Sequence, residues 1–222
     1  MERILSAWAW VAAVLTVLIG FFYVSMVWLV TAPFDSGRYR AGRAFRQLAV
    51  AHVKLNRLWR FETDGAPPDD PRRPYVVVSN HESYADIFLV SQFPWEMKWL
   101  SKDTIFRIPV MGWMMRMAND VPVTRGKRES AVAALVECRD RLARRVSVMI
   151  FPEGTRSPTD ELLPFKDGAF HLAIDAQVPI LPIATEGLTR ADLPALRERV
   201  RETIDAARRA LQRELAEADG VA

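Results

Sequence analysis

The sequence predicts an α/β fold, in which a largely parallel central sheet is flanked by helices, with a membrane-associated pair of helices at the N-terminus. Three observations lead to this prediction. An apolar run and a basic amphipathic run open the chain, strand-like and helix-like runs alternate after residue 75, and polar residues directly follow two of the strands. The 222 residues are enough for one domain with a hydrophobic core, and 50% of them are hydrophobic, which leaves apolar sequence for a membrane segment.

The first element is an apolar segment from Trp8 to Val30, interrupted only by small or weakly polar residues. At about 1.5 Å per residue, a helix of this length can cross a hydrocarbon core of about 30 Å. A cleaved signal peptide fits poorly, because the run is longer than the apolar region of a signal sequence and no small-residue cleavage pattern closes it. We therefore predict a membrane segment.

The second element, from Arg38 to Arg60, interleaves aromatic and aliphatic residues with arginine and lysine. A basic amphipathic helix beside a membrane segment is expected to lie in the membrane interface. The alternative is a helix that packs on the globular domain and turns a basic face to solvent. By the positive-inside rule, the arginines after the apolar run predict that the rest of the chain is cytoplasmic. We assign residues 1–62 to a membrane anchor.

Residues 65–71 are rich in glycine, proline and aspartate, a composition typical of a linker, so residues 63–222 are expected to form the globular domain. Short apolar runs in it alternate with helical patterns, which predicts a parallel sheet with its ligand site beyond the carboxyl ends of the strands. The expected strands are Tyr75–Val78, Lys98–Ser101, Asp120–Thr124, Val146–Phe151 and Val178–Ala184. The expected helices begin at Ser83, follow Ser101 in a methionine-rich stretch, and span Glu129–Arg145 and Asp192–Ala218.

A histidine and an aspartate follow the first of these strands. Ser83 is a suitable N-cap, which makes Asp86 the third residue of the helix and turns its carboxylate back towards the cap. With His81 in the preceding loop, Asp86 can accept a hydrogen bond from one ring nitrogen and leave the other free as a base. The alternative is that Ser83 and Asp86 form only a capping box and that His81 is an ordinary loop residue.

A second loop, Phe151–Ser157, follows another predicted strand. The guanidinium of Arg156 matches phosphate oxygens with paired hydrogen bonds, and Gly154 lets the backbone approach an anion closely. Glu153 can pair with Arg156 and fix its orientation. Three basic residues near other strand ends or loops can join Arg156 in an electropositive pocket: Lys102, Arg125 and Lys166. The alternative is an ordinary strand-ending turn with unrelated surface charges.

Composition excludes some classes of protein. The single cysteine, Cys138, excludes an internal disulfide framework and a cysteine-based metal cluster, and its position on a helical pattern indicates ordinary packing. A net charge of +3 makes the chain mildly basic, which suits anionic lipid headgroups as well as nucleic acid. Composition alone does not choose between these two partners.

Four motifs in a fixed order resemble those of the glycerolipid acyltransferases, and most closely the 1-acyl-sn-glycerol-3-phosphate acyltransferases. They are Asn80-His81 with Asp86, Lys102 with Pro109 and Gly112, Phe151-Pro152-Glu153-Gly154-Thr155-Arg156-Ser157, and Val178-Pro179-Ile180-Leu181-Pro182. The resemblance covers the chain from about Tyr75 to Ala184. It implies transfer of a fatty acyl chain from a thioester to the sn-2 hydroxyl of lysophosphatidic acid, which gives phosphatidic acid.

The resemblance also implies roles for single residues. His81 is the general base, and Asp86 holds its tautomer and stabilises the imidazolium. Lys102 and Arg156 bind the acceptor phosphate, with Arg125 as a further candidate. Glu153, Gly154 and Thr155 shape that pocket. Neither a metal ion nor a cofactor is expected; acyl-CoA or acyl carrier protein is the co-substrate. Core packing is the favoured interpretation of the methionine-rich stretch Met111–Met117, and an acyl-chain groove or lipid contact is the alternative.

The implied partners are a lysophospholipid acceptor, the acyl donor and the lipid bilayer, with no nucleic acid. Because the N-terminal plan is similar to that of bacterial members, we expect a bacterial inner membrane location with the catalytic domain on the cytoplasmic face. Two alternatives remain. One is acyl transfer to another lysolipid, such as a lyso-ornithine lipid. The other is an inactive lipid-binding variant, because the sequence after Ala184 is short for the family.

Overall fold

The computed structural model describes residues 2–55, 59, 61, 67–68, 70–159, 161–181, 185 and 188–219. Its strands form a sheet in the order β3-β2-β4-β1-β5. They are β1 Val76–Val78, β2 Met97–Lys102, β3 Val121–Val123, β4 Ser147–Ile150 and β5 Ile180–Leu181. The pairs β2–β3, β2–β4 and β1–β5 are parallel, with Leu100 opposite Val121, Met97 opposite Ser147 and Val76 opposite Ile180. The predicted α/β class with a parallel sheet is confirmed.

By their contacts the residues divide into two units, which are described separately. The first contains residues 1–75 and 83–149, and the second contains residues 76–82 and 150–222. The helices of the first unit are α1 Glu2–Thr31, α2 Tyr39–Leu55, α3 Ala85–Ser91, the 3-10 turn η1 Ile105–Arg107, α4 Met111–Met117 and α5 Arg128–Ala143. Those of the second are α6 Gly168–Ala176, the 3-10 turn η2 Arg190–Asp192 and α7 Leu193–Asp219.

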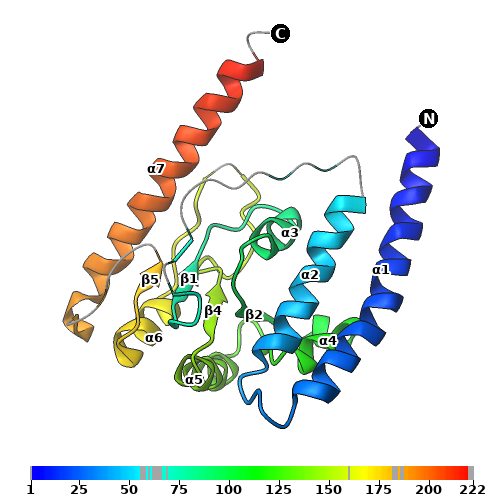
Figure 1. Cartoon of the computed structure of the whole chain (residues 1–222). Coiled ribbons are helices and arrows are strands. Elements are labelled where there is room, and N and C mark those ends of the chain that lie inside the picture. Colours follow the sequence, from blue (N-terminus) through cyan, green and yellow to red (C-terminus); the bar gives the residue numbers. More distant parts are fainter. Residues whose placement is uncertain are drawn as a thin grey trace. The chain divides into compact units, whose positions relative to one another are not determined.

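Helices α1 and α2 lie side by side in the first unit (Figure 1). The approach is close at Gly20, where an added Cβ would lie 2.3 Å from a methyl carbon of Leu48. Val24, Ala44 and Met114 form a buried cluster that joins both helices to α4. The outer side of α1 stays exposed, with large apolar residues such as Trp10, Ile19 and Phe22 on it.

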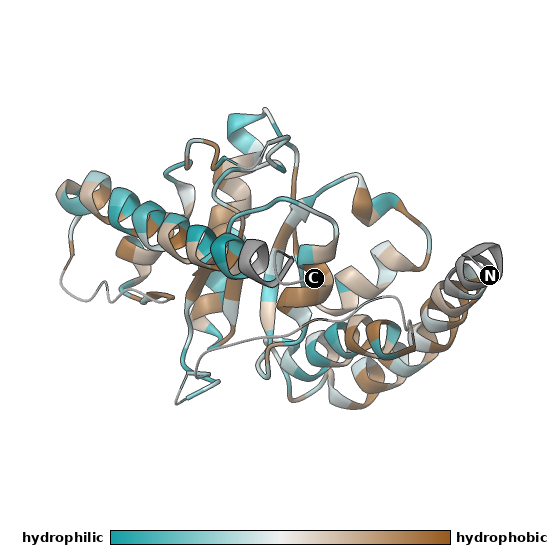
Figure 2. Ribbon diagram, turned by 90° about the horizontal axis from the view of Figure 1, so that it is seen from above, coloured by the Kyte–Doolittle hydropathy of each residue, from teal (hydrophilic) through white to brown (hydrophobic). Residues whose placement is uncertain are grey.

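The apolar window of α1, Trp10–Thr31, is long and apolar enough to cross a membrane (Figure 2). Only 11% of this window is buried. A core helix of a water-soluble domain would be mostly buried, because its apolar residues pack against the rest of the protein. The exposure of this helix therefore agrees with the predicted membrane segment.

Helix α2 packs on the globular part of the first unit, and one of its arginines is buried. Arg46 is 7% exposed and pairs with Asp120, which also accepts a hydrogen bond from the backbone nitrogen of Trp99 at 2.9 Å. The expectation of a helix whose basic residues all face solvent or headgroups is wrong for Arg46. The predicted end of this helix, residues 56–58 and 60, lies outside the described residues, as do residues 65, 66 and 69 of the predicted linker and residues 182–184 of the last strand.

A buried charge pair supports the same packing. Lys98 and Glu96 are both fully buried on or beside β2, with their charged atoms 3.0 Å apart, and Lys98 Nζ donates to the backbone oxygen of Arg38 at 2.8 Å. Gly42 of α2 lies directly against this pair, because an added Cβ would come within 2.0 Å of Glu96 Oε1. The absence of a side chain at Gly42 lets the helix approach the strand.

In the second unit, α6 packs on β1 and α7 packs on α6. Leu193, Leu196 and Val200 of α7 are buried, whereas Leu211 further along the helix is 56% exposed. The predicted amphipathic C-terminal helix is confirmed, and its packing is concentrated in the first two turns. Helix α6 was not among the expected helices. Its nine residues are mostly apolar on all sides, and the periodicity of so short a run does not separate a buried helix from a strand.

Cys138 is fully buried on α5, and burial raises the pKa of its thiol to about 12. The thiolate is the reactive form of cysteine, so the native protein should contain almost none of it at pH 8. We expect Cys138 to resist a thiol reagent at pH 8 in the folded protein and to react fully after unfolding in denaturant. Rapid labelling of the folded chain would contradict the packing role of this residue.

Candidate active site

His81 lies in the loop that follows β1, and its side chain is buried. The residue is 8% exposed, and its imidazole ring stacks on the ring of Phe151 with centroids 4.0 Å apart and an interplanar angle of 15°. Its backbone oxygen accepts a hydrogen bond from the backbone nitrogen of Ser157 at 2.8 Å. This hydrogen bond joins the loop after β1 to the loop after β4 within the second unit. Such proximity was predicted, because the carboxyl ends of parallel strands lie at the same edge of a sheet.

Glu153 fixes the backbone of this loop. It is 3% exposed, and one carboxylate oxygen accepts a hydrogen bond from the backbone nitrogen of His81 at 2.8 Å while the other accepts from Leu163 at 2.9 Å. The expected pairing of Glu153 with Arg156 is wrong, because both oxygens bind backbone N–H groups instead. A buried carboxylate that accepts two such bonds is well satisfied, and it holds His81 in place.

Asp86 lies in the first turn of α3, in the first unit, and its carboxylate turns back as predicted. One oxygen accepts a hydrogen bond from the backbone nitrogen of Ser83 at 3.0 Å, and Ser83 Oγ accepts from Ala85 at 3.1 Å. The helix itself begins one residue later than expected, with Tyr84 at the N-cap position and Asp86 as its second residue. Tyr84 itself already has helical dihedral angles, so by this criterion Ser83 is the last residue before the helix, as predicted, and the two boundaries differ by one residue.

Gly154 has a φ of +71°, a conformation that residues with a Cβ rarely adopt. The ammonium group of Lys166 lies over it, since a Cβ at Gly154 would be 2.3 Å from Lys166 Nζ. The backbone nitrogen of Lys166 donates to Pro152 at 2.9 Å, which ties the residue to the same loop. Thr155 and Arg156 are exposed beside this glycine. The structure therefore brings Lys166 to the predicted anion-binding loop.

Lys102 and Arg125 belong to the first unit. Lys102 is the last residue of β2 and is exposed, and its Cα pairs with that of Val123. Arg125 is exposed in the turn after β3, next to Gly126 with a φ of +81°. Both lie at or beyond the carboxyl ends of neighbouring parallel strands, as predicted.

The methionine-rich helix α4 mainly packs in the core. Met114 and Met115 are buried, and Met111 and Met117 pack against the cluster shared with α1 and α2, whereas Trp113 is 52% exposed. The favoured interpretation as core packing is thus correct for most of the stretch.

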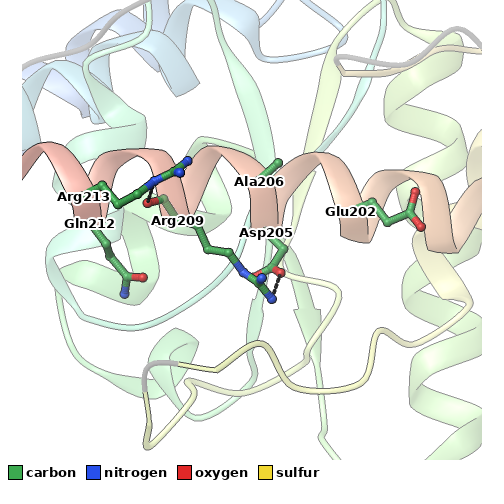
Figure 3. Close-up of a pocket in the computed structure, with 6 residues that line it drawn as sticks. All are labelled: Glu202, Asp205, Ala206, Arg209, Gln212 and Arg213. Carbon is green, nitrogen blue, oxygen red and sulfur yellow. Dashed lines mark hydrogen bonds and ion pairs between the residues drawn. The ribbon is translucent and has the colours of Figure 1, made fainter.

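A separate hollow on the surface of α7 carries an ion pair between Asp205 and Arg209 at 2.7 Å and no predicted site residue (Figure 3).

Comparison with known proteins identifies the family of this chain. A family profile described as "Acyltransferase" matches residues 60–186. The human 1-acyl-sn-glycerol-3-phosphate acyltransferase alpha is 33% identical over 199 residues, covering 76% of this chain and 70% of the human protein. The chain belongs to the 1-acyl-sn-glycerol-3-phosphate acyltransferase family. The predicted resemblance is confirmed.

Other members of this acyltransferase family match shorter stretches. The chloroplastic enzyme BAT2 of Brassica napus is 44% identical over 114 residues, which span 51% of this chain but 33% of the plant protein. The chain thus spans only about a third of the length of this relative. The crystal structure of PlsC from Thermotoga maritima, titled as a 1-acyl-sn-glycerophosphate acyltransferase, shares the fold, with a TM-score of 0.73 and 22% identity over 96% of this chain and 98% of that chain.

Sequence reasoning assigned Lys166 only a general place among nearby basic residues and did not select it as a site residue. Its only signal in the sequence is a basic side chain ten residues after Arg156. Without the fold, however, the return of residues 161–166 to Pro152 has no signature in spacing or periodicity.

Proposed function

We propose that this protein transfers a fatty acyl chain from an acyl thioester to the sn-2 hydroxyl of lysophosphatidic acid and so makes phosphatidic acid. The proposal is carried by one observation: in a member of this family, a buried His81 is held by Glu153 beside the Gly154–Arg156 loop. A base and an anion-binding loop next to each other are what acyl transfer to a phosphate-bearing alcohol needs.

In the proposed reaction, His81 takes the proton of the acceptor hydroxyl as its oxygen attacks the thioester carbonyl carbon. A tetrahedral oxyanion forms and collapses, the C–S bond breaks, and the thiolate takes the proton back from the imidazolium. Asp86 accepts a hydrogen bond from the other ring nitrogen, which sets the tautomer and stabilises the positive charge. Imidazole suits this exchange because its ordinary pKa lies closest to neutrality.

The acceptor phosphate is proposed to bind at the loop that contains Gly154, Thr155 and Arg156. Support comes from the positive φ of Gly154, which opens the backbone to close approach, and from the nearby ammonium of Lys166. Lys102 and Arg125 are proposed as further basic contacts, because they follow strands of the same parallel sheet. The acyl donor is acyl-CoA or acyl carrier protein, and the reaction takes up no further reactant.

Residues 1–62 are proposed to anchor the enzyme in a membrane, with the rest of the chain on the cytoplasmic face. The exposed apolar side of α1 supports the anchor, and the arginines that follow α1 support the orientation. For a bacterial cell, this corresponds to the inner membrane. The reaction then takes place where both the lysolipid and its product reside.

Product identification tests the function directly. Membranes that contain the full chain are incubated with acyl-CoA or acyl-loaded carrier protein and a mixture of lysolipids, and the products are identified by mass spectrometry. We expect phosphatidic acid as the main new product. If the only product derives from a lyso-ornithine lipid or another lysophospholipid, the acceptor is wrong; if lipid binds but no donor turns over, the chain is not an active enzyme.

The substitution Arg156→Ala should affect phosphate-bearing acceptors selectively. Loss of a guanidinium–phosphate contact worth about 1.5–3 kcal/mol predicts a fall of about 10- to 100-fold in kcat/KM for lysophosphatidic acid. The rate with an acceptor that has no phosphate should change far less. Arg139→Ala on the exposed part of α5 is the matched control. Equal losses with both acceptors would contradict the assignment of Arg156 to the phosphate.

A further inference from the structure

A cavity of about 280 Å³ lies in the first unit among α1, α2, α3 and α4. Most of its lining is apolar, as expected for a hydrocarbon chain, and includes Val17, Phe45, Leu48 and Met114. Ile87 and Phe88, the two residues that follow Asp86, also line it. The cavity therefore continues directly from the helix that carries a proposed member of the active site.

Two polar atoms in this apolar lining have neither a hydrogen bond nor an ion pair with any residue that the structure describes. They are Thr16 Oγ1 on α1 and His52 Nδ1 on α2, and both atoms are buried. His52 as a whole is 9% exposed, with its ring packed against Phe88 and Trp59. Buried polar atoms are nearly always paired in folded proteins, because an unpaired one forfeits its hydrogen bond with water. A ligand that lacked polar atoms would leave both unpaired.

The other polar lining residues are already accounted for. Ser91 Oγ donates to the backbone oxygen of Ile87 at 2.7 Å. Arg46 Nε also lacks a hydrogen bond, but it lies 4.0 Å from a carboxylate oxygen of Glu96, and the same guanidinium pairs with Asp120. Arg46 therefore belongs to the buried charge network. Among the described residues that line the cavity, Thr16 and His52 are therefore the two whose buried polar atoms still lack a partner.

We propose that this cavity holds an acyl chain that carries an oxygen substituent, a hydroxyl or a carbonyl along the chain, which hydrogen bonds to Thr16 and His52. The inference rests on the acyl-transfer function proposed above and names the substrate class. A hydroxyl both donates and accepts, so it can satisfy the hydroxyl of Thr16 together with a ring nitrogen of His52. Burial lowers the pKa of His52, which keeps the ring neutral and able to accept or donate at neutral pH.

The oxygenated chain can belong to the donor or to the acceptor, and the test separates them. The full chain in membranes is assayed with acyl-CoA donors of one length that carry no hydroxyl or a single hydroxyl at successive positions, with a plain lysophosphatidic acid. The reciprocal arm uses a plain donor and lysophosphatidic acids whose own chain is hydroxylated. In one arm, at least one hydroxylated chain should exceed the plain chain about two- to tenfold in kcat/KM, as one added hydrogen bond predicts.

Thr16→Val and His52→Phe keep the shape of the side chains and remove the polar atoms. In each, the preference ratio should fall towards 1, whereas Ser91→Ala, whose hydroxyl is already bonded within α3, should keep the wild-type ratio. The ratio is internal to each preparation, so poor folding lowers both rates and does not create the effect. Turnover of plain chains without any preference in the wild type would overturn this inference alone, whereas absence of turnover with every donor would overturn the proposed function.

Discussion

The substitution His81→Ala should lower kcat/KM for acyl transfer about 10²- to 10⁴-fold, because it removes the proposed base from the attack on the thioester. The rate is measured in membranes as formation of phosphatidic acid from acyl-CoA and lysophosphatidic acid. His81 packs flat on Phe151 and is almost fully buried, so the alanine variant leaves a ring-sized space. Free imidazole added to this variant should therefore restore part of the activity.

The matched control is His171→Ala, which removes a partly buried histidine from α6, outside the proposed site. Its activity should stay within a few-fold of the wild type. Asp86→Asn should also lose activity, since the amide no longer stabilises an imidazolium, and imidazole should not rescue it. If His81→Ala retains wild-type activity, the proposed mechanism fails, whatever the product is.

We propose that Glu153 affects the same reaction only by positioning the backbone of His81. Glu153→Gln keeps one oxygen acceptor and replaces the other with an NH₂ group, so the backbone nitrogen of either His81 or Leu163 loses its bond. Glu153 therefore supports the proposed site through two backbone hydrogen bonds, and the proposed reaction requires no contact between Glu153 and the substrate. Sequence reasoning paired it with Arg156 because a Glu three residues before an Arg suggests an ion pair, whereas its actual partners are backbone groups, which leave no trace in side-chain identity.

The fold was largely predictable because its signals are local. Apolar runs bounded by turn residues gave the strand positions to within a few residues, and the long periodic runs gave α5 and α7 closely. The prediction failed where local pattern is ambiguous, as in the short, mostly apolar α6. It also failed for Arg46, because an arginine in a basic amphipathic pattern is expected at the surface unless its buried partner Asp120, distant in sequence, is known.

The candidate site was predictable in its members more than in its geometry. Strand ends identify His81 and the Gly154–Arg156 loop, because in a parallel sheet these ends share one edge. The contact of Lys166 with Gly154 depends on a chain return through tertiary structure. The unpaired atoms of Thr16 and His52 could not be predicted from the sequence either. A threonine in a membrane segment and a lone histidine on a helix are common and carry no specific signal.

The buried pair of Glu96 and Lys98 should matter more to stability than any other ion pair described in the structure. Both side chains are fully buried, and burial raises the pKa of Glu96 and lowers that of Lys98 while each charge partly counteracts the other effect. Glu96→Gln should leave the Lys98 ammonium without its counter-charge in the interior. We expect a loss of about 3–5 kcal/mol in the free energy of unfolding, measured by denaturant titration of the detergent-solubilised chain.

The matched control is Glu137→Gln on α5, which removes a half-exposed partner of Arg141 held at 3.0 Å. Its cost should stay below about 1 kcal/mol, because solvent screens that pair. In Glu96→Gln, the pKa of Lys98 in the folded state falls further below its pKa in the unfolded state. At a pH between these two pKa values, the unfolded state binds one more proton than the folded state. Stability of this variant should therefore rise with pH towards the ordinary pKa of lysine, and it should be lost as pH falls.

Replacing both members together separates charge from packing. A Glu96→Met, Lys98→Met double variant removes the two desolvated charges at once and fills their space with apolar side chains, so it should recover most of the stability lost in Glu96→Gln. Gly42 constrains this result, because α2 lies directly against the pair and leaves little room for bulk. A double variant as unstable as the single one would show that these residues hold α2 by the hydrogen bond from Lys98 to Arg38, not by balanced charge.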